Sequence, residues 1–356
     1  MRDFKYPKAV ENLHLCCEGL VDSVKNDELR PAVGAFVANI DAVHSTLWLP
    51  VKLVGISFAM QHFGGSADEA IKKKYGLTRS TMTYPEHCDE LTAEIKRRHD
   101  AHVERMQNDP VWAAQNVVAG FDNFRRILID SPQLTRGTDA ILSAAVLGTW
   151  TAFETLTSDV WKTAINAAPN GLAELTGSPR RIAKLAGTRE SKSDDDEAEA
   201  ELAPSIDEDK EEKMIFLKAI QTTTGGNYNL SNKMGDLLRS RFRFISLRGI
   251  RRAYSTAFSE RIKGHDTSAI DSALANKCLD ALSLVRNIIV HNAGIATADY
   301  CRESNGVPTA IPLKPNEKLE LDGENFRAII DPTVASCKAL VSGADTWISL
   351  TRAAHA

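Results

Sequence analysis

A short run near residue 290 holds the side chains of this sequence that are best suited to chemistry. Arg286 is followed directly by Asn287, and His291 comes after four intervening positions. Arginine matches the oxygens of a phosphate and stabilises the charge that develops at phosphorus. Histidine titrates near neutral pH and can take or give a proton. These residue types could bind and cleave a phosphodiester without a metal, with Asn287 orienting the phosphate or the imidazole.

This chemistry predicts RNA as the substrate, because the nucleophile that it needs is a 2′-hydroxyl, which DNA lacks. The imidazole of His291 would take the proton of that hydroxyl or give one to the leaving 5′-oxygen. Two such histidines, one from each of two protomers, could divide these two roles.

The residues that flank the motif occupy two sides of a helical wheel. One side carries Leu284, Asn287, Ile288 and His291. This side lies away from the core stripe, and Arg286 sits roughly 140° from His291. A second, partly apolar side favours a partner helix, and a homodimer through the motif-bearing helix is the simplest such partner.

The helix that must position the motif is expected to run from about Ser268 to Asn292, with Gly294 as its C-terminal stop. Its expected core stripe consists of Ile270, Leu274, Cys278, Leu282, Val285 and Ile289.

Upstream of that helix, the stretch from Arg239 to Arg252 is rich in arginine and holds no acid. Its arginines are Arg239, Arg241, Arg243, Arg248, Arg251 and Arg252. Apolar residues recur between them at helical spacing, namely Phe244, Leu247, Ile250, Tyr254 and Phe258. One face can therefore pack while the other presents guanidinium groups, either as a solvated surface or as an RNA-binding track.

The rest of the chain also reads as helices. Residues 1–130 form an N-terminal helical region of unknown role, and one of its helices is predicted from Leu29 to Leu49. The apolar stretch from Thr46 to Met60 is interrupted by Pro50, so it predicts a buried helix pair or a turn and is too short to span a bilayer. We expect no membrane association.

A second unit is predicted from residue 137 to 352, and Thr138 is placed to cap its first helix, which would run to about Ile165. A final helix would start at Asp331–Pro332, and Lys318–Leu321 alternates like one arm of a short β-hairpin. Residues 190–213 carry a charge of −9, which leaves +5 for the rest of a chain whose net charge is −4. This composition predicts a mobile acidic insertion.

Several kinds of protein are disfavoured by composition. The six cysteines form no CxxC pair or disulfide-like framework, and no apolar signal segment opens the sequence, so we expect reduced thiols and a cytoplasmic location. There is no Gly-rich phosphate loop, and we expect no cofactor. His99 and His102 lie three apart on a predicted helix, but a metal site needs more converging ligands, so we expect no metal.

The motif region resembles the HEPN superfamily, in which an arginine and a polar residue are followed, after four to six positions, by a histidine. Arg286 to His291 matches that signature, and the continuation through Ile295 and Tyr300 is similar to prokaryotic HEPN proteins. Trp150–Glu154 and the stretch Arg239–Phe258 add to the resemblance, which covers roughly residues 137–352.

The resemblance implies an all-α fold, with an HEPN-like helical bundle that pairs with a second copy. It implies a metal-independent endoribonuclease that serves anti-phage defence, including abortive infection, or acts as the toxin of a toxin–antitoxin system, with an antitoxin or a phage trigger as a further partner. Arg286 and His291 would be the catalytic pair and Asn287 their polar neighbour, with Glu154 and Asn292 in supporting roles.

Two other functions remain open. Some HEPN domains are interaction modules without catalysis, and the arginine-rich helix would also suit a helical regulator that binds RNA or DNA. Without a catalytic role, Arg286 and His291 would be a pair of cations that the helix dipole favours near a C-terminus.

Overall fold

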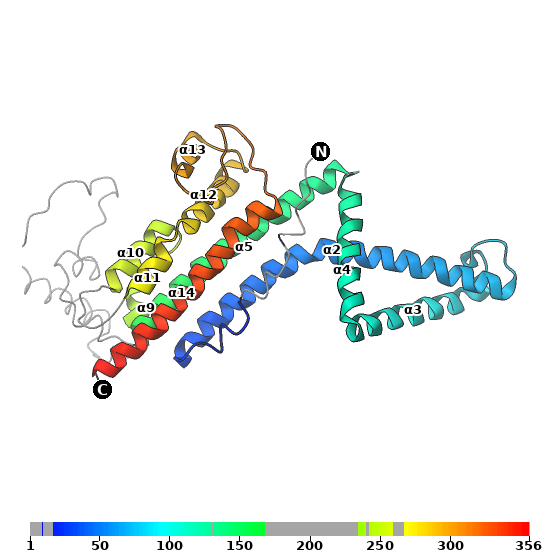
Figure 1. The fold of residues 1–356 in the computed structure, drawn as a ribbon, viewed down its shortest axis with the longest axis horizontal. Helices are drawn as coiled ribbons and strands as arrows, with labels where there is room; N and C mark the ends of the chain where they lie inside the picture. Colours follow the sequence, from blue (N-terminus) through cyan, green and yellow to red (C-terminus); the bar gives the residue numbers. More distant parts are fainter. Residues whose placement is uncertain are drawn as a thin grey trace, which may run out of the picture. The chain divides into compact units, whose positions relative to one another are not determined.

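In the computed structural model the chain is all-α over the residues that the structure describes, which are 9, 17–129, 131–167, 234–239, 242–258 and 267–355 (Figure 1). Its longer helices are α2 (Arg30–Tyr75), α3 (Cys88–Asn108), α4 (Pro110–Ile129), α5 (Pro132–Ala167) and α14 (Gly323–His355). Its shorter helices are α9 (Met234–Arg239), α10 (Leu247–Ala257), α11 (Ser268–Ala275), α12 (Lys277–Asn292) and α13 (Ala298–Ser304). The short 3₁₀ turns η2, η3 and η4 cover Asp27–Leu29, Thr81–Thr83 and Pro85–His87.

The chain divides into two compact units, and the three long helices α2, α5 and α14 contribute to both. The first unit contains Val43–Ala145, together with Leu321–Glu324. The second contains Val146–Glu320 and Asn325–Ala356, with the residues just before Val43. The division therefore falls inside α2, inside α5 and in the first turn of α14, whereas the sequence suggested one boundary between residues 130 and 137.

In the first unit, α3 runs back alongside the C-terminal half of α2 (Figure 1). Ala67 and Ile71 of α2 are buried together with Leu91 of α3. The two rings of Phe63 and His102 lie 5.3 Å apart, and the ring of His102 lies 4.9 Å from that of Trp112 at the start of α4. Burial, followed by the charge of the nearby His99, lowers the pKa of His102, so the neutral imidazole is favoured in this apolar junction.

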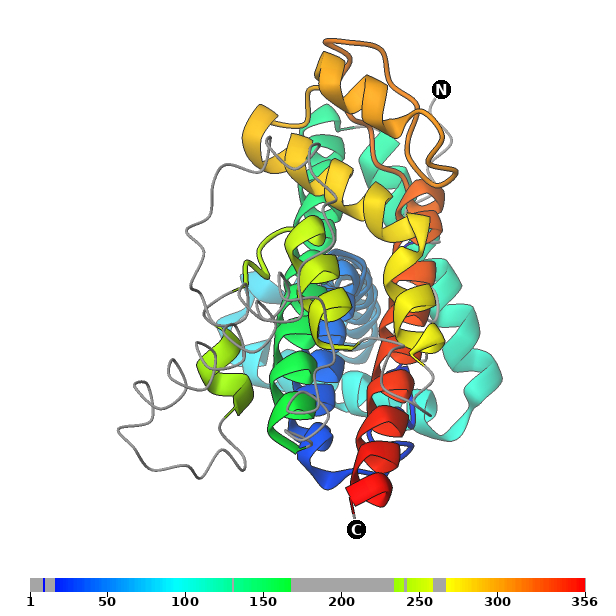
Figure 2. The ribbon, with the colours of Figure 1, turned by 90° about the vertical axis from the view of Figure 1, so that its left-hand side faces the viewer.

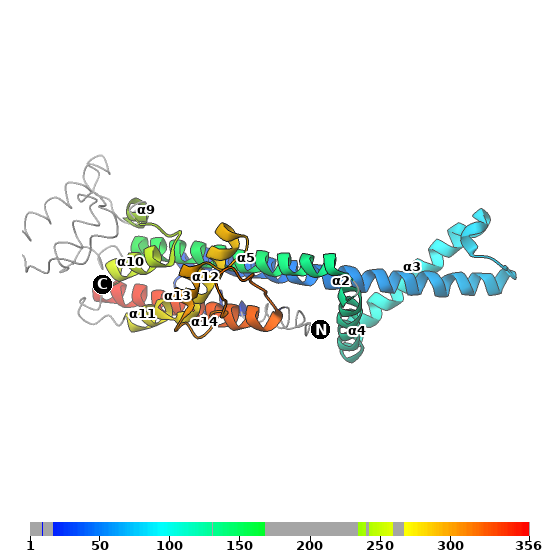
Figure 3. The same cartoon turned by 90° about the horizontal axis from the view of Figure 1, so that it is seen from above.

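In the second unit, α10 lies on the α5 side and α11 on the α14 side (Figures 2 and 3). The Nε1–H of Trp161 donates to the carbonyl of Ala253 at 3.1 Å, and the hydroxyl of Tyr254 donates to the carbonyl of Thr157 at 2.7 Å. These bonds join α10 to α5 through buried side chains, and the predicted apolar face of the arginine-rich helix is confirmed: Phe244, Leu247, Ile250, Tyr254 and Phe258 are all buried.

The stretch from Thr46 to Met60 is not a helix pair or a turn, because α2 continues through Pro50. A proline inside a helix removes one backbone hydrogen bond and usually bends the axis. Here Leu47 and Val51, on either side of Pro50, are both buried on one face of α2, and this packing maintains the helix.

The predicted helix from Ser268 to Asn292 is two helices, α11 and α12, which meet at Asn276. Asn276 has an extended backbone, its side chain accepts from the N–H of Cys278 at 3.1 Å, and its amide donates to the hydroxyl of Ser336 at 2.9 Å. Asparagine is a preferred N-cap, so the junction satisfies a helix terminus and holds it against α14.

The other predicted boundaries shift outward. Helix α5 begins at Pro132 rather than Thr138, and α14 begins at Gly323 with Pro332 inside it. The predicted hairpin is absent from the described residues, where a single antiparallel bridge joins Ile295 to Lys318. The acidic insertion at 190–213 lies outside the described residues.

Two helical stretches, Asp27–Tyr75 and Thr135–Ala167, are long and apolar enough to cross a membrane by length and composition. The most apolar 18 residues of the first have a mean hydropathy of 1.3 and are 17% buried, whereas those of the second have 1.2 and are 50% buried. The second therefore has the character of a core helix, and the first is largely uncovered.

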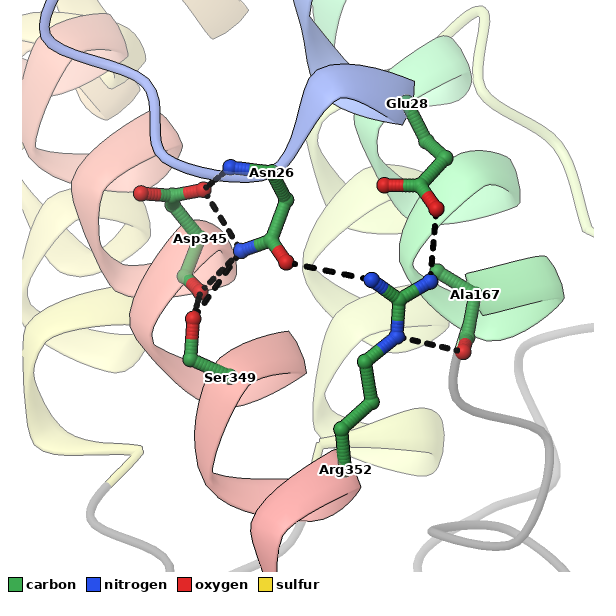
Figure 4. A network of polar contacts seen from close by, with 6 residues as sticks. All are labelled: Asn26, Glu28, Ala167, Asp345, Ser349 and Arg352. Atoms are coloured by element: carbon green, nitrogen blue, oxygen red, sulfur yellow. Dashed lines mark hydrogen bonds and ion pairs between the residues drawn. The ribbon is translucent and has the colours of Figure 1, made fainter.

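A buried polar network fixes the segment before α2 to the end of α14 (Figure 4). The carboxylate of Asp345, which is 6% exposed, accepts from the N–H of Lys25 at 3.0 Å and from the N–H of Asn26 at 2.9 Å. It also accepts from the Asn26 amide at 2.8 Å. Because two of these donors belong to the backbone, Asp345 holds the chain itself at the entrance to α2.

Arg352 extends this network (Figure 4). Its guanidinium contacts Glu28 at 2.7 Å and donates to the Asn26 side chain and to the carbonyl of Ala167, each at 3.3 Å. The hydrogen bond from Arg352 lowers the pKa of Glu28. The stabilisation from this pair is therefore present at and above the ordinary titration range of a glutamate, and is lost as the pH falls through the lowered pKa.

Replacing Asp345 by alanine is expected to lower the free energy of unfolding by about 2–4 kcal/mol, because buried donors are left without an acceptor. Urea unfolding followed by circular dichroism measures this loss. Thr346→Ala, which changes an exposed neighbour on the same helix, serves as the control and should cost under about 0.5 kcal/mol. Equal stability of the two variants would contradict a role of Asp345 in holding the chain.

Candidate functional site

Helix α12 carries the motif, and its buried face determines which residues are presented. Cys278, Leu279, Ala281, Leu282, Val285 and Ile288 are buried on it. Ala293 ends the helix with a left-handed backbone, φ 51°, and Gly294 follows at φ 77°. The left-handed terminus that was predicted from Gly294 is therefore shared with a non-glycine residue.

The structure brings Arg286 and Asn287 into direct contact. One guanidinium nitrogen of Arg286 donates to the side-chain oxygen of Asn287 at 3.0 Å. The guanidinium carbon lies 5.8 Å from the centre of the Trp150 ring, within the range of a cation–π interaction. No carboxylate forms an ion pair with Arg286 in the described part of the chain, so its positive charge is available to an anionic ligand.

The ring beneath Arg286 is itself fixed. Trp150 is 3% exposed, and its Nε1–H donates to the carboxylate of Glu154 at 3.1 Å, one helical turn along α5. The rings of Trp150 and Phe153 lie 5.7 Å apart. Glu154 therefore orients the indole of Trp150, which in turn contacts Arg286. A supporting role of Glu154 at the site would be exerted through this indole.

His291 lies in the last turn of α12 and is exposed, and Asn292 beside it is half-buried. Within the described ranges, no contact joins His291 to Arg286. Val290 and Ile295 are 47% and 44% exposed on the same part of the molecule. The end of α12 and the residues just after it thus present an imidazole, an amide and two apolar side chains on an open surface.

On the side of α12 that the helical wheel predicted to face a partner helix, fewer residues are exposed than predicted. Ile288 is 2% exposed and belongs to the core of the chain, while Ile289, expected in the core, is half-buried. Ile288 follows buried Val285 by three positions, so both fall on the face that packs internally. The residues left exposed near the motif are Asn287, Val290 and His291.

The described arginines of the set expected to bind RNA, which are all but Arg241, differ in their surroundings. Arg251 donates to both carboxylate oxygens of Asp280, at 2.7 and 3.0 Å, and to the carbonyl of Leu274 at 2.8 Å. This bidentate pair joins α10 to α11 and α12, so Arg251 has a packing role within the chain, and its place in the RNA-binding set stays a prediction.

The other arginines differ in their surroundings. Arg239 lies 3.8 Å from Asp159, and Arg252 is half-buried, whereas Arg243 and Arg248 are exposed. Arg241 lies outside the described residues. The basic surface that these helices can offer to a phosphate backbone therefore centres on Arg243 and Arg248.

Replacing Arg248 by alanine is expected to weaken RNA binding several-fold and to reduce the slope of log affinity against log salt by about one, with little change in stability. Replacing Arg251 should lower the free energy of unfolding by about 1–3 kcal/mol, because Asp280 loses a bidentate partner. Filter binding at several salt concentrations and urea unfolding separate the two roles. Lower stability of the Arg248 variant, together with weaker RNA binding but unchanged stability of the Arg251 variant, would contradict these two roles.

No group of three or more His, Cys, Asp or Glu side chains that could hold a metal occurs among the described residues. His99 and His102, the two neighbouring histidines of α3, both have ring contacts with Phe63 instead, at 6.4 and 5.3 Å.

Sequence reasoning missed two residues that position the site. Trp150 entered only as part of the resemblance, without a contact to Arg286, and Asp280 was not singled out. Both act across long separations in sequence, on Arg286 and Arg251, and no local pattern marks such a contact.

Comparisons of the chain with protein-family models, with curated proteins and with solved structures found no match.

Proposed function

We propose that this protein is a metal-independent endoribonuclease of the HEPN type, with Arg286, Asn287 and His291 in its active site. The observation that carries the proposal is that the guanidinium of Arg286 is held in place without an acidic partner. It has no carboxylate partner in the described chain, and it is oriented by Asn287 and by the ring of Trp150, so it can bind an anion. A cation that served only the helix dipole would not need this second, buried support from α5.

The reaction proposed is attack of the 2′-hydroxyl on the adjacent phosphorus. A histidine takes the proton of the 2′-hydroxyl, the new P–O2′ bond forms, and the P–O5′ bond breaks. A second proton donor protonates the leaving 5′-oxygen, giving a 2′,3′-cyclic phosphate and a 5′-hydroxyl. Arg286 stabilises the negative charge on the non-bridging oxygens as the phosphorus becomes five-coordinate.

A homodimer through α12 would supply both the group that takes the proton of the 2′-hydroxyl and the group that protonates the 5′-oxygen. In one protomer, His291 is open to water and makes no contact with Arg286 within the described ranges. The exposed Val290 and Ile295 beside it provide apolar area for a partner helix. Two copies of α12 facing each other would supply two imidazoles around one phosphate and would exclude water from it. The proposed biological role is anti-phage defence or toxicity in a prokaryote.

Incubation of RNA with the wild type and with His291→Ala, both in the presence of a chelator, tests this function. Cleavage that resists the chelator and is lost in the variant supports the ribonuclease. Equal cleavage by both proteins would exclude His291 as a catalytic residue. RNA binding without cleavage by the wild type would instead favour an interaction module, or a regulator that uses Arg243 and Arg248.

A further inference from the structure

The segment that leaves the end of α12 is paired with a second segment that carries a lysine. Ile295 and Lys318 form an antiparallel bridge. Two backbone hydrogen bonds, of 2.6 and 2.8 Å, join the residues on either side of this pair. In a pair of this kind the Cα atoms lie about 4.5 Å apart and the two side chains point to the same side. Lys318 therefore lies directly beside Ile295.

The side to which this pair points is open to solvent. Ala296 and Leu319, the next residues in sequence, are 1% and 8% exposed. Neighbours along an extended segment point to opposite sides, so the burial of these two residues turns Ile295 and Lys318 outward. Both side chains of the pair are exposed.

The pair follows directly on the last turn of α12, which carries His291. The N–H of Ile295 donates to the carbonyl of Asn292 at 2.9 Å, so the chain turns sharply where the helix ends. Together with the bridge, this bond places the Cα atoms of Asn292 and Lys318 within about 12 Å of each other. The long side chain of Lys318 thus belongs to the open surface that presents His291.

A fixed turn sets the position of Lys318. The N–H of Glu317 donates to the carbonyl of Lys314 at 3.0 Å, and Asn316 has a φ of 69°. Pro315 and Asn316 occupy the two central positions, where a type II turn favours proline and requires a positive φ. The carboxylate of Glu317 also accepts from the N–H of Lys314 at 2.8 Å. Lys318 follows this turn directly and precedes a buried residue, so its backbone is held from both sides.

The charge of Lys318 is not taken up by the protein. No carboxylate forms an ion pair with it among the residues that the structure describes. On the neighbouring helix α13, by contrast, Arg302 pairs with Asp299 at 2.8 Å. Arg286 and Lys318 thus bring two cations without a carboxylate partner to the C-terminal part of α12 and the segment beside it. An RNA strand carries one negative charge per nucleotide, so a second cation can bind a neighbouring phosphate.

We propose that Lys318 binds a phosphate next to the cleaved bond and so positions the RNA strand across the end of α12. This inference rests on the proposed ribonuclease function and adds a substrate-binding residue to it. Lysine suits the role, because its ammonium is a compact charge on a flexible stem and contacts phosphate without reading a base. Lys318 transfers no proton. It holds the strand so that the 2′-hydroxyl meets His291.

Steady-state cleavage of RNA under chelator tests the proposal. Lys318→Ala is expected to raise KM several-fold and to leave kcat unchanged, because the lost contact is present in the bound and transition states alike. The slope of log KM against log salt should fall by about 0.7, the value for one phosphate contact with a single strand. Lys318→Arg should restore KM. Lys25→Ala is the control: Lys25 is exposed, and its backbone is bonded to Asp345, roughly 33 Å along α14 from the first residue of that helix.

Neutral linkages locate the contacted phosphate. An RNA with a mapped cleavage position is prepared with a single methylphosphonate at successive positions on either side of the cleaved bond. One of these linkages should raise KM of the wild type as much as Lys318→Ala does, and should have no further effect in that variant. An unchanged KM of Lys318→Ala, with cleavage by the wild type intact, would overturn this inference alone. A wild type that cleaves no RNA would remove the ribonuclease function and the inference with it.

Discussion

Replacement of Arg286 by alanine is expected to lower kcat/KM for RNA cleavage by about 10²–10³-fold, because a positioned donor at the reacting phosphate is removed. The guanidinium is half-buried over Trp150 and makes no ion pair within the described chain, so the fold should tolerate the change. Initial rates under subsaturating RNA, with thermal unfolding alongside, measure the effect.

Arg286→Lys is the matched control, since it keeps the charge and loses the planar fork that binds two phosphate oxygens. Its activity should fall between those of the wild type and the alanine variant. Trp150→Phe keeps an aromatic ring but removes the hydrogen bond to Glu154, so a smaller loss in kcat is expected. Wild-type cleavage by Arg286→Ala would remove this residue from the site.

Replacement of His291 by alanine should reduce kcat for RNA cleavage by about 10²–10⁴-fold and leave RNA binding nearly unchanged, because a positioned acid or base contributes to the chemical step. His291 is exposed, so its removal should not disturb the core. His62→Ala, which changes an exposed histidine of α2, is the control and should cleave like the wild type.

Mixed dimers extend the test of His291. If two histidines from two protomers share the acid and base roles, dimers of one wild-type and one His291→Ala chain should be nearly inactive. Titration of wild type with excess variant, after exchange of subunits, should then lower the total activity. Additive activities, without such inhibition, would contradict a site built from both protomers.

The amphipathic helix of the arginine stretch was predictable because a helix places residues three and four apart on one face. Every apolar residue predicted there is buried. The fate of each arginine was not predictable, because it depends on a tertiary partner. Arg251 and Arg248 have the same side chain and lie three residues apart, yet Arg251 forms an ion pair with Asp280 and Arg248 is exposed.

Helix α2 illustrates the opposite difficulty. Its apolar residues between Thr46 and Met60 predicted burial, and Pro50 predicted an interruption. The structure shows one continuous helix in which apolar residues between Leu49 and Met60 are exposed. Hydrophobicity predicts that a surface will be covered but does not specify whether its own chain or another will cover it.

The candidate site was partly visible in the sequence. The order of Arg286, Asn287 and His291 placed them near the end of one helix, where the structure has them. The ring of Trp150 beneath Arg286 and the carboxylate of Glu154 behind it required the packing of α5 against α12. Such second contacts determine whether a cation is held ready for a ligand, and periodicity alone does not reveal them.

The proposed reaction depends most directly on the 2′-hydroxyl at the cleaved bond. An RNA with a mapped cleavage position should be compared, under chelator, with the same RNA carrying a single 2′-deoxy nucleotide on the 5′ side of that bond. The wild type should cleave the first to a 2′,3′-cyclic phosphate and a 5′-hydroxyl, and should leave the second intact at that position. Cleavage of both RNAs at the same bond, or loss of all cleavage under chelator, would contradict a metal-independent ribonuclease.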